Sequence, residues 1–420
     1  MKALFILLLC AASSFTVFAQ NRNVIWVHGL GSGPDFWNEY AAEFQQQRRI
    51  VSSNQGYNTA NGVPAMAGDI TNRTRGLANP QTIGIGHSMG GLSLREIDAR
   101  TAPGHVGGFI TVGSPLNGAR LVNNVQNGQL TSYVSHGVDE MLKGPLRELL
   151  GAGYIVLNTG TRAFTGRSII EVLLHEIGLD EILVSQLPAS APQLAENSQY
   201  MNGNNGMIGA RQLRTTRPTI SIYGNENSPV HFRLASSFTG RPDTHFPNIV
   251  RDIRGVYNAF YIKNVVTFFN IINISRAAGW KAGRDYLDSG SEKGWNNLTG
   301  ATRSESRQSC LEEWVCGNDY SCYDNIVTFE DFLACEELCY QTRCRTITER
   351  YNQPSDGLLH LSTQLGQRTN ITTSQWNPNA TFEALGANHS EFDQHPGTRD
   401  IFDIIFDRRV NAVPDFFRTP

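Results

Sequence analysis

Residues 84–93 read GIGHSMGGLS and place Ser88 between Gly86 and Gly90. The apolar run before this serine is typical of a buried strand, and a helix is expected from Met89 onward. A serine at such a junction lies on a strained turn, where flanking glycines prevent clashes between the strand and the helix. Because glycine-rich chains match G-x-S-x-G by chance, the pattern predicts a nucleophile only within this strand–turn–helix frame. The alternative is an ordinary glycine-rich bend.

Further apolar runs that end in loops lie on both sides of this stretch. They occupy residues 23–33, 106–119, 218–229 and 380–396, and an amphipathic helix is expected around residues 400–409. Short, nearly continuous apolar strands that alternate with helical segments are typical of a parallel sheet covered on both faces. The sequence therefore predicts the α/β class, with a mostly parallel sheet and helices on both faces.

Two long segments interrupt the predicted sheet, so we expect a core in two parts. The first part covers residues 20–228, with a lid-like insertion at about 120–205 that contains helix-like stretches. The second part covers residues 351–420. Between them, residues 229–350 predict a helical, cysteine-rich cap. Insertions of this kind usually carry specificity above one edge of a rigid sheet.

The N-terminus predicts export. Residues 1–19 begin with a positive charge at Lys2, continue as an apolar run and end in VFA, a small-x-small cleavage pattern. The run is too short to remain as a membrane span. We therefore expect a cleaved signal peptide, a mature chain that starts at Gln20, and a secreted or periplasmic protein.

Six cysteines follow the predicted signal peptide, all within one short segment. They are Cys310, Cys316, Cys322, Cys335, Cys339 and Cys344. An even, clustered number in an exported chain predicts three local disulfides, whose connectivity the spacing leaves open. The alternative is a metal site, but no histidine lies within the cluster and the CxxC spacing of zinc sites is absent. No metal site or cofactor is therefore expected here.

Charge and hydropathy exclude two classes of partner. The formal net charge is −3 at pH 7 and basic residues do not cluster, which gives no electrostatic reason to bind nucleic acid. The most apolar later stretch, residues 256–275, is interrupted by Lys263 and by several asparagines. It predicts a partly buried or surface helix and not a transmembrane span. The oligomeric state stays open.

A nucleophilic serine needs a base and donors for the oxyanion that forms during attack. The HGLGSG turn after the first predicted strand is expected to present the amide of Leu30, and the amide of Met89 is expected to be the second donor. His28 in this turn is interpreted as a structural brace. The predicted base is His389, because it lies in a loop between the last predicted strand and the terminal helix.

Two carboxylates compete to orient the imidazole of this base. Asp356 lies in the glycine turn PSDGLLHLS, and Glu226 lies in IYGNENSP just beyond a predicted strand. Either side chain could fix the imidazole tautomer and stabilise the imidazolium. The spacing alone leaves this choice open.

Several of these motifs together resemble the α/β-hydrolase superfamily, and within it the secreted bacterial lipases and esterases. The resemblance rests on VIWVHGLGSG, GIGHSMGG, TVGSPLNGA, PSDGLLHLSTQLG and GANHSEF, which cover about half of the chain. It implies Ser88 as nucleophile, His389 as base and Asp356, in preference to Glu226, as acid. It also implies oxyanion donors at Leu30 and Met89. Some members of the family bind a structural calcium ion, for which no ligands are identified here.

The resemblance implies a secreted serine hydrolase that cleaves carboxylic esters through an acyl-enzyme. A lipid or another apolar acyl ester is the expected substrate. The same residues could instead serve an amidase, a thioesterase, a polyester depolymerase or a deacylase of glycolipid anchors. A further alternative is a non-catalytic binding protein built on the hydrolase fold.

Overall fold

The computed structural model describes most of the chain. The described residues are 22–150, 190–204, 208–226, 231–233, 244–267, 271–314, 340–366, 378–408 and 410–418, and the two strands between 303 and 351 are described by their backbone alone. The predicted signal peptide, residues 1–19, and part of the predicted lid, residues 151–189, lie outside these residues. The described chain divides into two units, Met1–Ala301 with Pro354–Pro420, and Thr302–Gln353.

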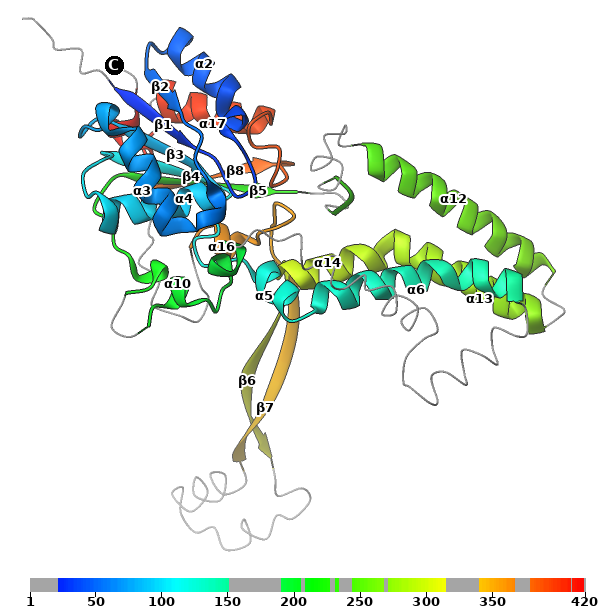
Figure 1. The fold of residues 1–420 in the computed structure, drawn as a ribbon. Coiled ribbons are helices and arrows are strands. Elements are labelled where there is room, and N and C mark those ends of the chain that lie inside the picture. Colours follow the sequence, from blue (N-terminus) through cyan, green and yellow to red (C-terminus); the bar gives the residue numbers. More distant parts are fainter. Residues whose placement is uncertain are drawn as a thin grey trace, which may run out of the picture. The chain divides into compact units, whose positions relative to one another are not determined.

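The first unit is built on a six-stranded sheet in the order β2-β1-β3-β4-β5-β8, with every neighbouring pair parallel (Figure 1). The strands are β1 (Asn23–Val27), β2 (Val51–Asn54), β3 (Ile83–His87), β4 (Gly108–Val112), β5 (Thr219–Asn225) and β8 (Ala380–Leu385). Every residue of β1, β3 and β4 is buried, as expected for strands covered on both faces. The predicted α/β class with a parallel sheet is confirmed.

Helices cover both faces of this sheet because successive strand residues point to opposite sides. Trp26 joins a core that includes α2 and α17, and the next residue, Val27, joins a second core that includes α3 and α4. Figure 1 shows these two pairs of helices on opposite sides of the sheet. The helices are α2 (Asn38–Gln47), α3 (Val63–Arg73), α4 (Met89–Glu96) and α17 (Pro396–Asp407).

Short helical segments complete the first unit. They are α5 (Arg120–Gln126), α10 (Gln199–Asn202), α14 (Ser291–Thr299), α16 (Leu361–Gln364), the 3-10 turns Pro34–Trp37, Thr59–Asn61, Arg75–Leu77, Ala191–Leu194, Ala210–Gln212 and Asp415–Phe417, and the π turns Ile97–Thr101 and Tyr286–Gly290.

The strand order reverses between β1 and β3, and the loops that leave these two strands diverge at the carboxyl edge of the sheet. In an open parallel sheet this point is where ligands bind.

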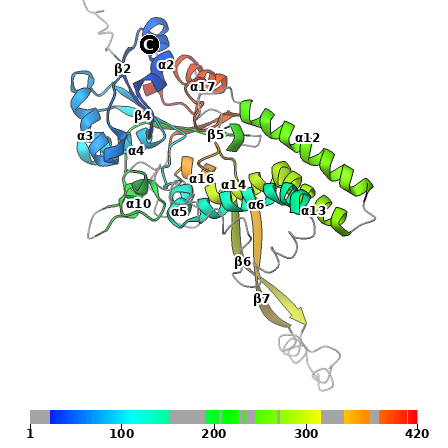
Figure 2. The same ribbon diagram turned by 45° about the vertical axis from the view of Figure 1, so that its right-hand side comes forward.

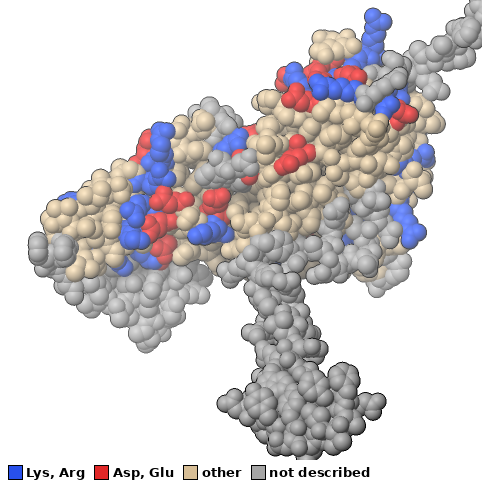
Figure 3. Space-filling view, turned by 180° about the vertical axis from the view of Figure 1, so that it is seen from behind, with Lys and Arg blue, Asp and Glu red and all other residues tan. Residues whose placement is uncertain are grey.

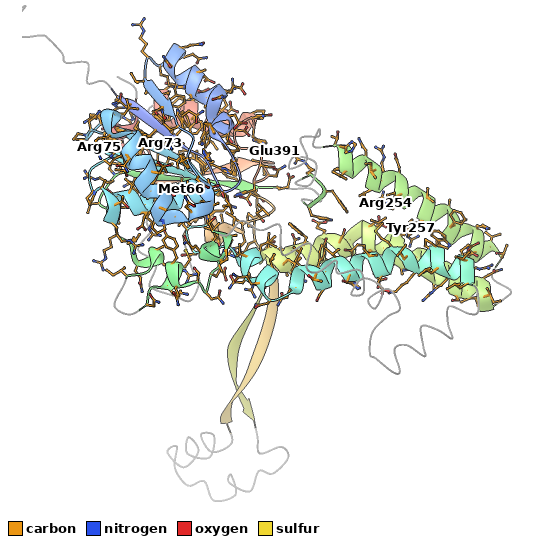
Figure 4. The ribbon with its side chains drawn as sticks, viewed as in Figure 1. Met66, Arg73, Arg75, Arg254, Tyr257 and Glu391 are labelled. Atoms are coloured by element: carbon orange, nitrogen blue, oxygen red, sulfur yellow. The ribbon has the colours of Figure 1, made fainter. Side chains whose placement is uncertain are left out.

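Three long helices pack together and form what we call the helical arm. They are α6 (Gln129–Leu150), α12 (His245–Val266) and α13 (Ile271–Asp285), and α6 runs beside α13 in both ribbon views (Figures 1 and 2). Their contact depends on small residues: a Cβ at Gly283 would lie 2.1 Å from Tyr257 Cε1. Tyr257 projects from α12, as labelled in Figure 4. The segments expected as a separate lid and cap therefore share one helical layer.

The cap was expected as a helical, cysteine-rich insertion; its described part contains helices, and its last part also contains two strands that the sequence analysis did not predict. The second unit is an antiparallel hairpin of β6 (Thr302–Trp314) and β7 (Tyr340–Asn352). Its register makes Cys310 and Cys344 direct cross-strand partners. The other four cysteines lie outside the described residues, so the three disulfides stay a prediction.

The apolar stretch 256–275 was expected as one helix, but α12 ends at Val266 and α13 begins at Ile271. Among the helices that the structure describes, none combines the length and the apolar content needed to cross a bilayer. The polar surface is mixed in sign: Figure 3 shows Lys and Arg standing beside Asp and Glu on the face turned away in Figure 1.

Candidate active site

Ser88 lies on a strained turn between β3 and α4. Its backbone has φ 52° and ψ −127°, in a region that residues other than glycine rarely adopt and that costs about 1–3 kcal/mol. The glycines on either side are required by close packing. A Cβ at Gly90 would lie 2.5 Å from the carbonyl oxygen of Val27, and one at Gly86 would lie 2.6 Å from the carbonyl carbon of Gly90. The turn thus holds the serine at the carboxyl edge of the sheet.

The structure brings Ser88, His389 and Asp356 into one hydrogen-bonded chain. His389 Nε2 lies 3.0 Å from Ser88 Oγ, and His389 Nδ1 lies 2.7 Å from Asp356 Oδ2. All three residues are buried, and Asp356 has no exposed surface. They come from three loops that are far apart in the sequence. With Nδ1–H donating to the carboxylate, Nε2 is left to accept the serine proton.

The loop of Asp356 fixes its carboxylate. The amides of Leu358 and Leu359 donate to Asp356 Oδ1 over 3.0 and 2.8 Å, so Oδ2 is the oxygen that faces His389. The backbone ties the same two loops together, because the His389 amide donates to the Asp356 carbonyl over 2.7 Å. These bonds hold the acid and the imidazole in register before any substrate binds.

Glycines at two strand ends leave room for this carboxylate. A Cβ at Gly113, after β4, would lie 3.2 Å from Asp356 Oδ2, and one at Gly224, in β5, would lie 2.7 Å from Asp356 Cβ. The other predicted acid, Glu226, forms an ion pair with Arg233. The structure therefore places Asp356 at the imidazole and Glu226 in a neighbouring ion pair.

The turn after β1 closes over the serine from the other side. A Cβ at Gly29 would lie 2.7 Å from Ser88 Cβ, so this backbone touches the nucleophile directly. The predicted oxyanion donors, Leu30 and Met89, follow Gly29 and Ser88 in the chain. Within the described part of the chain, neither of their amides donates to an acceptor. The role of these two amides as oxyanion donors stays a prediction.

His87 has a role that the sequence analysis did not identify. Its Nε2 donates to the carbonyl of His389 over 2.9 Å, and the two rings lie 4.9 Å apart. Burial, followed by the nearby His389 ring, holds the pKa of His87 well below 6.5. A neutral His87, stacked on Phe36 at 4.4 Å, therefore positions the loop of the candidate base. A histidine before the serine carries no spacing signal for this role.

His28 behaves as a brace, as its position in the turn suggested. Its ring stacks on Tyr57 at 4.0 Å, and the Tyr57 hydroxyl donates to the His28 carbonyl over 3.1 Å. Burial lowers the pKa of His28, which favours the neutral ring. For a metal ion, the described residues hold no group of three or more His, Cys, Asp or Glu side chains. The possible calcium site stays a prediction.

Of the comparisons with known proteins, only the one with solved structures found similar chains. No protein-family description and no curated protein matches the chain. An epoxide hydrolase from Bacillus megaterium aligns with 13% identity and a TM-score of 0.27, over 50% of this chain and 78% of that chain. An extracellular α/β-hydrolase from a Paenibacillus species aligns with 14% identity and a TM-score of 0.25, over 47% and 76%. A Listeria innocua protein aligns with 10% identity and a TM-score of 0.33, over 95% and 98%.

Proposed function

We propose that this chain is an exported serine hydrolase of the α/β-hydrolase type that cleaves carboxylic esters through an acyl-enzyme. One observation carries the proposal: Ser88 Oγ, His389 and Asp356 form a buried hydrogen-bonded chain at 3.0 and 2.7 Å. The strained backbone of Ser88 supports it, because strain of this kind persists where the surrounding structure holds a reactive group in place.

In the proposed acylation step, His389 Nε2 accepts the Ser88 hydroxyl proton while Oγ attacks the ester carbonyl carbon. The carbonyl oxygen becomes an oxyanion and accepts hydrogen bonds from the amides of Leu30 and Met89. Each such donor typically stabilises the transition state by about 3 kcal/mol. Asp356 stabilises the imidazolium that forms, and this imidazolium donates its proton to the departing alkoxide. The alcohol leaves, and the acyl group remains on Ser88.

In the proposed deacylation step, a water molecule replaces the alcohol. His389 accepts a proton from this water as its oxygen attacks the acyl carbon, and the same two amides hold the second oxyanion. The imidazolium then returns a proton to Ser88 Oγ, and the carboxylic acid is released. The net reaction adds one water across the ester bond. No step requires a metal ion or an organic cofactor.

We assign an apolar acyl group to the substrate because apolar side chains surround the serine turn. Leu30 and Phe36 are only partly buried: Leu30 follows Gly29, which packs on Ser88, and Phe36 stacks on His87 at 4.4 Å. The apolar surface that these two side chains keep beside the serine favours alkyl chains through the hydrophobic effect. The intact hydrogen-bonded chain favours catalysis over a purely binding role, which would not need a base on the serine.

The test is Ser88→Ala, assayed on p-nitrophenyl esters of increasing acyl length. We expect kcat to fall by roughly 10^6-fold, because removal of a serine nucleophile abolishes the acyl-enzyme route. A fluorophosphonate probe should label the unaltered chain and not the variant. Circular dichroism provides the control that the variant is folded. Turnover by Ser88→Ala at the unaltered rate would remove Ser88 from this role.

A further inference from the structure

The end of the helical arm where α6 and α12 finish and α13 begins exposes large aliphatic side chains. We call this group the apolar tip, and its exposed fractions are Leu149 80%, Leu150 42%, Val265 37%, Val266 70% and Ile274 52%. Single exposed aliphatic residues are common on protein surfaces, but a group of them at one place marks an interaction site. The three helix ends lie together in both ribbon views (Figures 1 and 2).

Polar bonds hold these three helix ends together. Lys263 Nζ and Asn264 Nδ2 of α12 contact the Glu148 carboxylate of α6 at 3.2 and 3.3 Å. Arg147 Nη1 of α6 donates to the Ser275 carbonyl of α13 over 2.9 Å. Because these residues directly precede or follow the exposed aliphatic residues in each helix, the apolar tip is one continuous feature of the arm.

Cations lie directly behind the apolar tip and farther along the same helices. Lys263 Nζ and Arg276 Nε lie 3.2 and 3.9 Å from the Glu148 carboxylate, and Arg147 precedes Glu148 in the chain. Farther along α12 and α13, a cavity of about 490 Å³ is lined by three arginines, but each of them pairs with an aspartate, so the cavity adds little net charge; its lining is Arg251, Arg254, Gly255, Asn258, Arg284 and Asp288. Figure 4 labels Arg254 on α12. Positive charge beside exposed aliphatic surface complements a membrane that carries anionic head groups.

We propose that the apolar tip docks onto a lipid bilayer that contains anionic lipids. The composition of the tip favours lipid over a protein partner. Protein interfaces depend on Trp, Tyr and Arg anchors, and leucine and valine are under-represented among their energetic centres. The five described residues that define the tip are all aliphatic, and the Lys263 side chain, 61% exposed, can reach head groups from a long stem. The proposal deepens the proposed function, since it would bring an ester hydrolase to the surface where apolar esters reside.

Cosedimentation with vesicles tests this docking. The purified protein is mixed with vesicles of phosphatidylcholine alone or of phosphatidylcholine with phosphatidylglycerol, and the bound fraction gives a partition coefficient. We expect tighter binding to the anionic vesicles and weakening by salt. The double variant Leu149→Asp with Val266→Asp should lower the coefficient by about 30-fold or more, because two aliphatic side chains no longer enter the bilayer. Lys263→Gln should lower it by about 5-fold on anionic vesicles alone.

Val51→Asp is the matched control, because Val51 is also an exposed aliphatic residue, 46% exposed, but lies on the edge strand β2. It should bind vesicles as the unaltered chain does. Thermal melts and hydrolysis of a soluble short ester without vesicles report that each variant folds. If the aspartate pair lowers the melting temperature, Leu149→Ser with Val266→Ser replaces it.

Three outcomes would overturn the proposal. The unaltered chain does not bind either vesicle, or the tip variants bind as well as it does, or the tip variants convert a dimer to a monomer without altering vesicle binding. The last result would assign the tip to a second copy of the chain. Ser88→Ala should bind vesicles normally. A chain that binds vesicles but hydrolyses no ester would therefore contradict the proposed function and leave the docking intact.

Discussion

The sheet core and the helical arm are stabilised in different ways. In the core, large rings interlock: Trp26 lies 5.1 Å from Trp37 and 5.0 Å from Phe44, and all three are buried. In the arm, the long helices α6 and α12 bury few large apolar residues. Their buried positions are Gly137, Asp139 and Gly144 in α6, and Tyr257 and Asn264 in α12.

This difference separates two tasks. A densely packed core can hold Ser88 at a φ of 52°, because the energy of burial offsets the local strain. The arm buries little apolar surface and leaves aliphatic side chains exposed at its end, so its local stability is expected to be lower. Chemistry is therefore assigned to the core, and contact with a surface to the arm.

After removal of the nucleophile itself, the largest expected effect concerns Asp356, the predicted acid in the core. Asp356→Asn should lower kcat by about 10^4-fold, because an amide at this position favours the wrong imidazole tautomer. Glu226→Gln is the matched control and should change kcat by less than about 3-fold, because the Glu226 carboxylate contacts Arg233 whereas the His389 imidazole contacts Asp356. Steady-state hydrolysis of a soluble ester measures both. Equal losses in the two variants would contradict the assignment of Asp356.

The second prediction concerns pH and the core. Burial holds the pKa of His87 well below 6.5, so below pH 6.5 the unfolded chain binds a proton that the folded chain does not. The free energy of unfolding should therefore fall as pH drops below 6.5, by up to about 1.4 kcal/mol per pH unit. The contribution of His87 is fully present above pH 6.5. Thermal melts across this range measure the slope.

Asp393 has the opposite effect on the free energy of unfolding, at lower pH. Burial raises its pKa from 3.8 to about 6, so the folded chain gains a proton first and is stabilised as pH falls through about 6. Burial also lowers the pKa of four other histidines, which add to the loss below pH 6.5, so the contribution of His87 is measured as a difference between variants; these are His28, His105, His231 and His395. His87→Asn, which keeps a donor but does not titrate, should flatten this slope. His136→Asn, an exposed position on α6, is the control. An unchanged slope in His87→Asn would contradict the assignment.

A smaller effect on kcat is expected at Trp295, a residue of α14 that contacts the loop of Asp356. Trp295 Nε1 donates to the carbonyl of Gly357, the residue after Asp356, over 2.6 Å. Trp295→Phe keeps most of the ring and removes this bond. We expect kcat for a soluble short ester to fall by up to about 10-fold with little change in KM, because the bond positions the acid and does not touch substrate.

Trp280→Phe supplies the comparison within the arm. Trp280 stacks on Phe260 at 4.6 Å, meets Tyr257 at 5.1 Å, and its Nε1 lies 3.4 Å from Glu148. Its loss should lower the melting temperature and leave kcat unchanged. If both variants lower kcat equally, the effect comes from general loosening of the helices and Trp295 is not a positioning residue.

Local chemistry explains how much of the core could be predicted from sequence. The strands β1, β3, β4 and β5 carry apolar runs that end in glycine-rich or polar loops, and such runs indicate buried strands. The Ser88 turn was predictable because steric contact forces glycine at residues 86 and 90. Strand β2 was not predicted, since VSSN lies at the sheet edge and only Ser53 is buried. An edge strand has less need of apolar side chains.

Contacts between distant segments explain what could not be predicted. The choice between Asp356 and Glu226 depends on which side chain reaches His389, and only the resemblance favoured the first. The arm joins helices that the sequence separates by about a hundred residues. Their contact rests on glycines such as Gly144, where a Cβ would lie 2.6 Å from the Trp280 ring. A glycine in a helical pattern usually indicates weakness, so its packing role is not visible in sequence.

The smallest expected effect is on stability. It compares a helical glycine in the arm with one in the core, because a glycine can either weaken a helix or permit close packing. Gly255 lies exposed in α12, and a Cβ there would have no heavy atom within 4 Å. Gly255→Ala should stabilise the arm by about 0.5–1 kcal/mol through helix propensity and leave kcat unchanged. Gly90→Ala in α4 should have the opposite sign, because its Cβ would lie 2.5 Å from the Val27 carbonyl oxygen. Urea unfolding measures both. If Gly255→Ala instead lowered the free energy of unfolding, another part of the protein would have to pack against α12 at Gly255 in solution. The arm would then be closely packed at this position, as the core is.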